Sequence, residues 1–170
     1  MGRLVKQGSG HPYFGDLLKR ELILADLSFR SAEAVLRHMG EQLVSLGYCR
    51  KGFVEAILER EAHHPSGLPM EGRKIAIPHT DAKYVNKSAI LFARLRTPVT
   101  FRSMGNPSQL LQVEMVSMFA LKEKQRIGDL LEVLLTVYQD SFLLDLLYAA
   151  SSPDEIYRIL KRHVEETTGR

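Results

Sequence analysis

The sequence predicts an α/β protein: a three-layer sandwich in which a small mixed sheet of about five strands has helices on both faces. Apolar residues recur at three- and four-residue spacing near both ends of the chain, which is typical of amphipathic helices. Short apolar runs occupy the middle of the chain, as in buried strands. The resulting order is helix, helix, strands, helices, with few β-hairpin signals.

Composition limits the classes of protein to consider. The 170 residues are enough for one domain with a complete core, and we expect a loosely ordered N-terminus at 1–12 and a single domain at 13–170. The net charge of +3 is small and no basic run is interleaved with aromatic residues, so nucleic acid is not an expected partner. No apolar stretch approaches the roughly 20 residues that span a bilayer, so direct membrane insertion is not expected. Cys49 is the only cysteine, which excludes an internal disulfide and favours a reducing, cytoplasmic compartment.

The first third of the chain predicts mainly helices. A short helix could open at 15–18, and a short strand could lie at 22–24. An amphipathic helix is predicted at Ser31–Leu46, because Ser31 supplies an N-terminal cap and Gly47 is placed to end it. A second helix is predicted from Gly52 to Ala62.

The middle of the chain predicts a loop followed by strands. The loop covers 63–74 and is rich in proline and glycine. Apolar runs predict a strand at 75–77, a doubly buried strand at 88–95, a short edge strand at 99–101 and a strand at 111–121, with a turn at 104–108.

The remainder is predicted to be helical. Helices are expected at 125–138 and 142–149, and the second is so apolar that we expect it to pack deeply. A last helix should begin at Pro153, where Ser152 and Glu155 have the spacing of a capping box.

The segment Ile75-Ala76-Ile77-Pro78-His79-Thr80-Asp81 carries the first functional signal. Three apolar residues lead into Pro78, which cannot donate to a sheet, so the strand should stop there. His79 then lies where a strand gives way to a loop, a frequent position for a reactive side chain. Taken alone, so short a pattern fits an ordinary polar loop residue better than a reactive one.

Other kinds of site have less support. His63 and His64 could form a metal site with His79, but adjacent histidines in a loop tend to point apart and no zinc-binding motif accompanies them, so no metal is predicted. Cys49 has no catalytic signature around it. The sequence has neither a Gly-x-Ser-x-Gly elbow nor a glycine-rich phosphate loop, and no cofactor is predicted.

His79 and Arg60 together suggest phosphoryl chemistry. A neutral imidazole has one free lone pair, which can attack a phosphoryl group and hold it transiently. An arginine fork would stabilise the negative charge, and the hydroxyl of Thr80 is a candidate donor. For Arg60 alone, a helix-end cation interacting with the helix dipole is the simpler interpretation.

Three segments in fixed order strengthen the phosphoryl interpretation: Leu58-Glu59-Arg60-Glu61, then Pro65-Ser66-Gly67, then Ile75-Ala76-Ile77-Pro78-His79. With Ser88-Ala89-Ile90 and Pro98-Val99-Thr100-Phe101, they resemble the mannitol/fructose-type enzyme IIA of the bacterial sugar phosphotransferase system (PTS). The resemblance extends from about Ser28 to the end of the chain. The loop length between Arg60 and His79 is most similar to that of the galactitol-specific branch.

The resemblance implies a cytoplasmic phosphocarrier. It would accept phosphoryl from the phosphohistidine protein HPr and pass it to a cysteine of a sugar-specific enzyme IIB, and through it serve the membrane enzyme IIC. Matching positions imply that His79 is the nucleophile and Arg60 the phosphoryl stabiliser. The substrate implied is galactitol or a related polyol.

One region departs from the family pattern. Many mannitol and fructose members have a second histidine after the last strand, whereas this chain has none at 122–128. Gln125 or Arg126 could supply a donor there. Two other functions remain open: a regulatory relative, in which a partner reads the phosphorylation state of His79, and a metal-binding or purely structural module.

Overall fold

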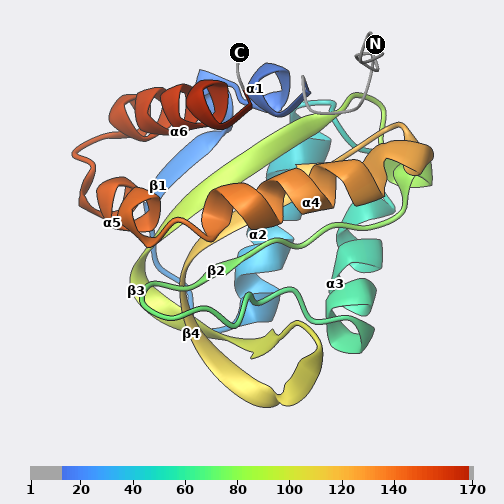
Figure 1. Ribbon diagram of the computed structural model, residues 1–170. Helices are drawn as coiled ribbons and strands as arrows, with labels where there is room; N and C mark the ends of the chain where they lie inside the picture. The colour runs from blue at the N-terminus through green and yellow to red at the C-terminus, as the bar shows by residue number, and fades with distance from the viewer. Residues whose placement is uncertain (1–12, 169–170) are drawn as a thin grey trace, which may run out of the picture.

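The computed structural model describes residues 13–168 (Figure 1). The predicted loose N-terminus at 1–12 lies outside the described residues. A four-stranded sheet forms the centre, in the order β1-β3-β4-β2. Its strands are β1 at Ile23–Leu27, β2 at Ile75–Ala76, β3 at Ala89–Ser103 and β4 at Asn106–Ala120. The outer strands each run parallel to their neighbour, whereas β3 and β4 are antiparallel, so the sheet is mixed as predicted.

The strand count of about five was one too high for the described residues. The segments predicted as strands at 88–95 and 99–101 are the two halves of β3. They join across Pro98, where the pairing of β3 with β4 shifts register between Arg94 and Val99. Such an irregularity tolerates a residue without an N–H. The predicted turn at 104–108 begins the second strand of a long hairpin, with Gly105 at a φ of +81°.

Helices cover both faces of the sheet, as predicted. Figure 1 shows α2 and α3 on one side of the strands and α4, α5 and α6 on the other. The bounds are α1 at Tyr13–Leu17, α2 at Ala32–Ser45, α3 at Phe53–His63, α4 at Ile127–Tyr138, α5 at Ser141–Ala149 and α6 at Pro153–Thr168. Short 3-10 segments lie at Arg20–Leu22, Ala82–Tyr84 and Lys124–Arg126.

Local signals for helix ends agree with the structure. The Ser31 hydroxyl accepts a hydrogen bond from the Ala34 N–H at 3.1 Å, and Gly47 follows α2 with a φ of +83°. Ser152 likewise accepts from the Glu155 N–H at 3.1 Å. The predicted capping box is only half formed, because the Glu155 carboxylate accepts from the backbone N–H and hydroxyl of Ser151 and not from the Ser152 N–H. The deep packing expected for α5 is only half right, because Phe142 is 70% exposed while its neighbour Leu143 is buried.

The sheet separates two apolar cores, and side chains of one strand alternate between them. Ile75 and Ile77 point into the core under α4, α5 and α6, whereas Ala76 points into the core under α2 and α3. The short strand β2 is therefore held from both sides by apolar burial.

Backbone pairing also fixes the segment that ends β2. The Pro78 carbonyl accepts from the Phe119 N–H at 3.1 Å on the β4 side. On the opposite side, the Ile77 N–H donates to the Ser66 carbonyl at 3.0 Å. Gly67 in turn donates to the Arg102 carbonyl at 3.1 Å at the end of β3. The chain immediately before His79 is thus embedded between two partners.

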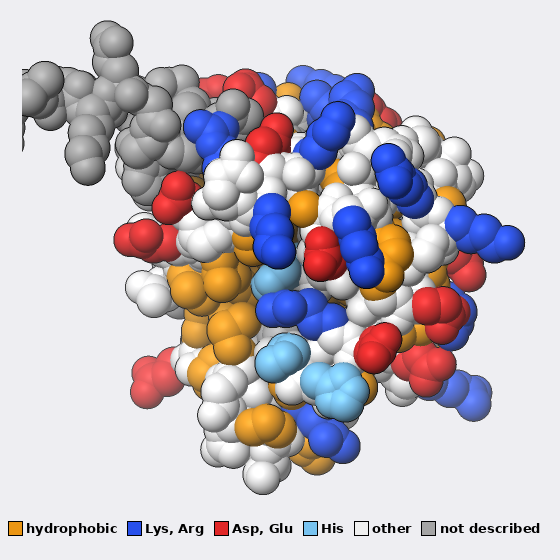
Figure 2. Space-filling view, turned by 90° about the vertical axis from the view of Figure 1, so that its right-hand side faces the viewer, with side chains coloured by type: hydrophobic (Ala, Val, Ile, Leu, Met, Phe, Trp, Pro, Cys, Tyr) orange, Lys and Arg blue, Asp and Glu red, His pale blue; other side chains and the backbone are white. Residues whose placement is uncertain are grey.

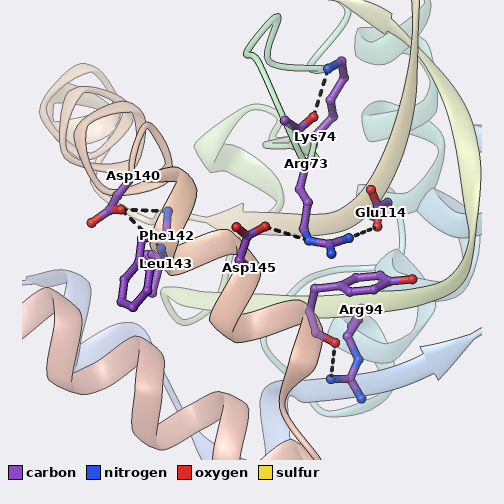
Figure 3. Close-up of polar contacts among 10 residues, drawn as sticks. Arg73, Lys74, Arg94, Glu114, Asp140, Phe142, Leu143 and Asp145 are labelled. Atoms are coloured by element: carbon purple, nitrogen blue, oxygen red, sulfur yellow. Dashed lines mark hydrogen bonds and ion pairs between the residues drawn. The ribbon is translucent and has the colours of Figure 1, made fainter.

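Arg73 fixes the chain that enters β2 (Figure 3). Its guanidinium donates to Glu114 of β4 at 2.8 Å and to Asp145 of α5 at 2.9 Å. It also lies 3.7 Å above the centre of the Tyr148 ring. Because Glu114 is largely buried, this pair is better shielded from solvent than most surface ion pairs.

Candidate functional site

His79 lies just beyond β2, partly buried, with its ring stacked on Phe119 of β4. The ring centres are 4.4 Å apart and the planes differ by 18°. Its Nδ1 atom is buried and makes no hydrogen bond of regular geometry with the described residues. The Ile77 carbonyl interacts with the imidazole and favours its protonated form. Of the two ring nitrogens, Nε2 is the one that is not recorded as buried, and His79 borders the hollows described below.

The surroundings keep this imidazole neutral. Burial first, and the charge of Arg60 second, lower the pKa of His79 to about 4, while the Ile77 carbonyl acts in the opposite direction. A histidine with this pKa is neutral at pH 7, so one of its two ring nitrogens carries a free lone pair. His79 is therefore available as a nucleophile without a separate base.

The predicted site residues border one hollow of about 490 Å³. Arg60 comes from the last turn of α3, and His79 and Thr80 follow β2. Arg60 is exposed and Thr80 is buried. The Asp81 carboxylate accepts from the backbone N–H of Lys83 at 3.0 Å, which caps the 3-10 turn that follows. Lys83 and Lys124 add positive charge to the same hollow.

A second hollow, of about 370 Å³, lies beside the first, and the two share Arg60 and His79. Its apolar lining includes Ile77, Met104 and Leu131. Figure 2 shows this arrangement on one face of the molecule, where histidine and basic side chains lie next to an apolar area. His79 therefore borders a hollow with several charged side chains, called the polar hollow below, and a second one to which Ile77, Met104 and Leu131 add an apolar side, called the apolar hollow.

His63 and His64 are brought to the site in a way that the sequence did not predict. Both border the two hollows together with His79. Their position at the end of α3, three and four residues after Arg60, was the available signal. Among the described residues, no group of three or more His, Cys, Asp or Glu could hold a metal ion.

Glu61 is a second residue that sequence reasoning did not assign to the site. Its carboxylate accepts from the Ser66 N–H at 3.1 Å and so closes the loop after α3. Burial raises its pKa, which the contact with Ser66 partly offsets. Gln125 and Arg126, which were considered as replacement donors, line neither of these two hollows, whereas Lys124 lines the polar one.

The family described as "Phosphoenolpyruvate-dependent sugar phosphotransferase system, EIIA 2" matches residues 16–163. The chain belongs to this family. The resemblance on which the sequence analysis relied is thereby confirmed, and the protein is a PTS enzyme IIA phosphocarrier.

Individual relatives agree with the family. The galactitol-specific EIIA component of Escherichia coli K12 is 27% identical over 105 residues, which cover 62% of this chain and 70% of the relative. The nitrogen regulatory protein of Bradyrhizobium diazoefficiens is 34% identical over 98 residues, covering 56% and 62%. A solved complex of mannitol enzyme IIA with phosphorylated enzyme IIB from Escherichia coli matches with a TM-score of 0.70 and 26% identity, over 84% of this enzyme IIA and 96% of that chain.

These relatives place this enzyme IIA among phosphoryl-transfer components, and its family implies HPr and an enzyme IIB as partners. No helix among residues 13–168 has both the length and the apolar character needed to cross a membrane.

Proposed function

We propose that this enzyme IIA accepts phosphoryl from HPr on Nε2 of His79 and passes it to a cysteine of a sugar-specific enzyme IIB. One observation carries the assignment of the nucleophile. His79 is an imidazole that is neutral at pH 7, its Nδ1 atom is buried, and the residue borders a basic hollow. Such a ring is oriented for attack by one nitrogen only.

The proposed transfer requires no general base, because the nucleophilic nitrogen carries a lone pair and no proton has to be removed from it. The lone pair of His79 Nε2 forms a bond to phosphorus as the bond from phosphorus to the donor's ring nitrogen breaks. The unit transferred is PO₃⁻, and the bonding electron pair returns to the donor ring. The other ring nitrogen keeps its proton, and the Ile77 carbonyl, which favours the protonated ring, stabilises the positive charge.

Arg60 and Thr80 complete the proposed machinery. Arg60 lies close enough to lower the pKa of His79, which supports its role as the group that neutralises the phosphoryl oxygens. Thr80 borders the same hollow and is a candidate hydroxyl donor. A planar guanidinium fits two phosphoryl oxygens at once, which a lysine cannot do.

The apolar hollow is the proposed docking surface for the two relay partners. Met104, Pro107 and Leu131 lie beside His79 there. A protein interface with an apolar centre next to the reacting atom would exclude water from the transferred group. The solved complex of a related enzyme IIA with phosphorylated enzyme IIB supports a protein acceptor of this kind.

For the transported substrate we propose galactitol or a related polyol. The support comes from the galactitol-specific relatives of Escherichia coli at 27% identity. In such a relay the enzyme IIA contacts HPr and enzyme IIB and not the sugar, so the substrate would be selected downstream. The relay would operate in the cytoplasm.

A regulatory role is the second candidate. The nitrogen regulatory protein of Bradyrhizobium diazoefficiens is more similar over its matched segment than the galactitol relatives, at 34% identity. In that case His79 would still be phosphorylated, and a partner protein would read its state.

The decisive experiment incubates the protein with phosphoenolpyruvate, enzyme I and HPr and follows its intact mass. Wild type should gain one phosphoryl group that is labile in acid and stable in base. His79→Gln should gain none, because no neighbouring side chain is an activated nucleophile. His38→Gln is the matched control: this histidine also packs beside an aromatic ring, at 5.2 Å from Phe29, and does not border the hollows of His79.

The same material separates transport from regulation. Addition of a polyol-specific enzyme IIB should discharge the phosphoprotein if the relay serves uptake. A phosphoprotein that transfers to none of several enzyme IIB proteins would favour the regulatory role. Labelling of His79→Gln at the wild-type level would refute the assignment of the nucleophile.

A further inference from the structure

Two imidazoles besides that of His79 border the two hollows at the site. His63 is the last residue of α3 and His64 is its C-terminal cap, three and four residues after Arg60. Both border the polar hollow and the apolar hollow that meet at His79. The backbone that carries them is fixed, because the His64 N–H donates to the Arg60 carbonyl at 2.6 Å and the Ser66 N–H donates to Glu61.

Both rings are available to a ligand. Among the described residues, neither His63 nor His64 makes a side-chain hydrogen bond, an ion pair or a ring contact, and both are exposed. Two of the other histidines are engaged: His38 lies beside the Phe29 ring, and His163 faces Asp140 at 3.6 Å.

The charged side chains around the polar hollow nearly cancel, so a phosphoryl group there would need further hydrogen-bond donors. The polar hollow contains Arg60, Lys83 and Lys124 opposite Glu59 and Asp81, so its formal charge is +1 from these residues. A phosphoryl group on His79 would add nearly two negative charges and three oxygens that accept hydrogen bonds. Even a neutral imidazole donates one hydrogen bond, so His63 and His64 add donors whatever their protonation state.

We propose that His63 and His64 donate hydrogen bonds to the phosphoryl oxygens on His79 and are catalytic residues of the transfer. The proposal rests on the proposed function of His79 and adds two residues to it. They would act while phosphorus is between the donor nitrogen and His79 Nε2, when negative charge is spread over the three oxygens.

The first test compares loading rates from phospho-HPr. His63→Ala and His64→Ala together should slow loading at least roughly tenfold, because removing charge-assisted donors from a transferring group typically has effects of this size or larger. The paired glutamine variants should be slower than wild type and faster than the alanine variants, since an amide retains a donor. His38→Ala is the matched control and should load at the wild-type rate. Thermal unfolding of each variant checks the fold.

The second test needs no substitution in the protein. In ¹⁵N-histidine-labelled wild type, phosphorylation of His79 should shift the ring resonances of His63 and His64, and the His163 ring should not shift. The inference is overturned if the doubly substituted alanine variant loads at the wild-type rate, or if both rings keep their resonances after phosphorylation. Wild type that takes no label at all would instead overturn the proposed function, so the two failures are distinguishable.

Discussion

At the scale of single residues, the position of His79 determines both its protonation state and its effect on the stability of the protein. Stacking on Phe119 and burial of Nδ1 remove the ring from water, which disfavours the imidazolium form. The same burial that orients Nε2 therefore also keeps it unprotonated. A fully exposed histidine would have neither property.

Stability should depend on pH through this residue. The folded-state pKa of about 4 lies below the value of 6.5 for an unperturbed imidazole, so the unfolded chain binds the additional proton between these values. The free energy of unfolding should therefore fall as pH drops from about 6.5 to about 4, by on the order of 3 kcal/mol from this group. Urea unfolding of wild type and His79→Gln at pH 7 and pH 4.5 measures it. Equal pH dependence in the two proteins would contradict the prediction.

Arg60 should act on His79 through its charge and on phosphoryl through its shape. Arg60→Ala should raise the pKa of His79, which NMR titration of the ring measures, and should slow loading from phospho-HPr. Arg60→Lys should preserve the pKa better than the rate, because lysine retains charge but not the planar fork. Both variants should lose less than roughly 1 kcal/mol of stability, since Arg60 is exposed. Native loading by Arg60→Ala would limit the residue to a structural role.

At the scale of elements, the site depends on how the loop segment at 66–68 packs against the short strand β2. The loop segment Ser66–Leu68 lies between β2 and the end of β3, and its backbone bonds to both. Gly67 occupies the tightest point: a Cβ atom there would lie 2.7 Å from the Arg102 carbonyl oxygen. A rigid carbonyl cannot move aside as a flexible side chain can.

Gly67→Ala should therefore destabilise the protein by about 1–3 kcal/mol and disturb the base of His79. Urea unfolding measures the first effect and the loading rate measures the second. Gly128→Ala in α4 is the control, because a Cβ atom there meets nothing within 4 Å and alanine favours the helix. It should leave stability unchanged or raise it slightly. Similar losses in both variants would mean that the close approach at Gly67 is not limiting.

At the scale of the whole molecule, one buried cation connects the sheet with the helices of one face. Arg94 of β3 is 6% exposed, and its guanidinium donates to the carbonyls of Leu147, Tyr148 and Ala150 at the end of α5. It also pairs with Asp26 of β1 at 3.2 Å. The last carbonyls of a helix have no partner within that helix, so Arg94 satisfies them where water cannot.

Arg94→Met should cost about 3 kcal/mol or more, because it keeps the apolar volume but leaves several buried carbonyls without donors. The loss should appear as a lower urea midpoint. Arg162→Ala removes an exposed pair with Glu166 and should cost less than roughly 0.5 kcal/mol. Comparable losses in the two variants would contradict the structural role assigned to Arg94.

The sequence alone determined what depends on near neighbours. The caps at Ser31 and Ser152, the end of α2 at Gly47 and the stop of β2 before Pro78 each follow from one or two residues and their backbone preferences. The order of three short segments, ending in Pro78-His79, was enough to indicate the family that residues 16–163 match.

Only the tertiary structure decided what depends on distant segments. The two apolar runs that meet at Pro98 became one strand because β4 pairs with both, which no local pattern encodes. His63 and His64 border the same two hollows as His79 because the fold brings the end of α3 next to the residues that follow β2. The pKa of His79 likewise follows from burial beside Phe119 and from the charge of Arg60, residues 40 positions after it and 19 before it in the printed sequence. Packing and electrostatics act through space, so these properties appear only once the chain has folded.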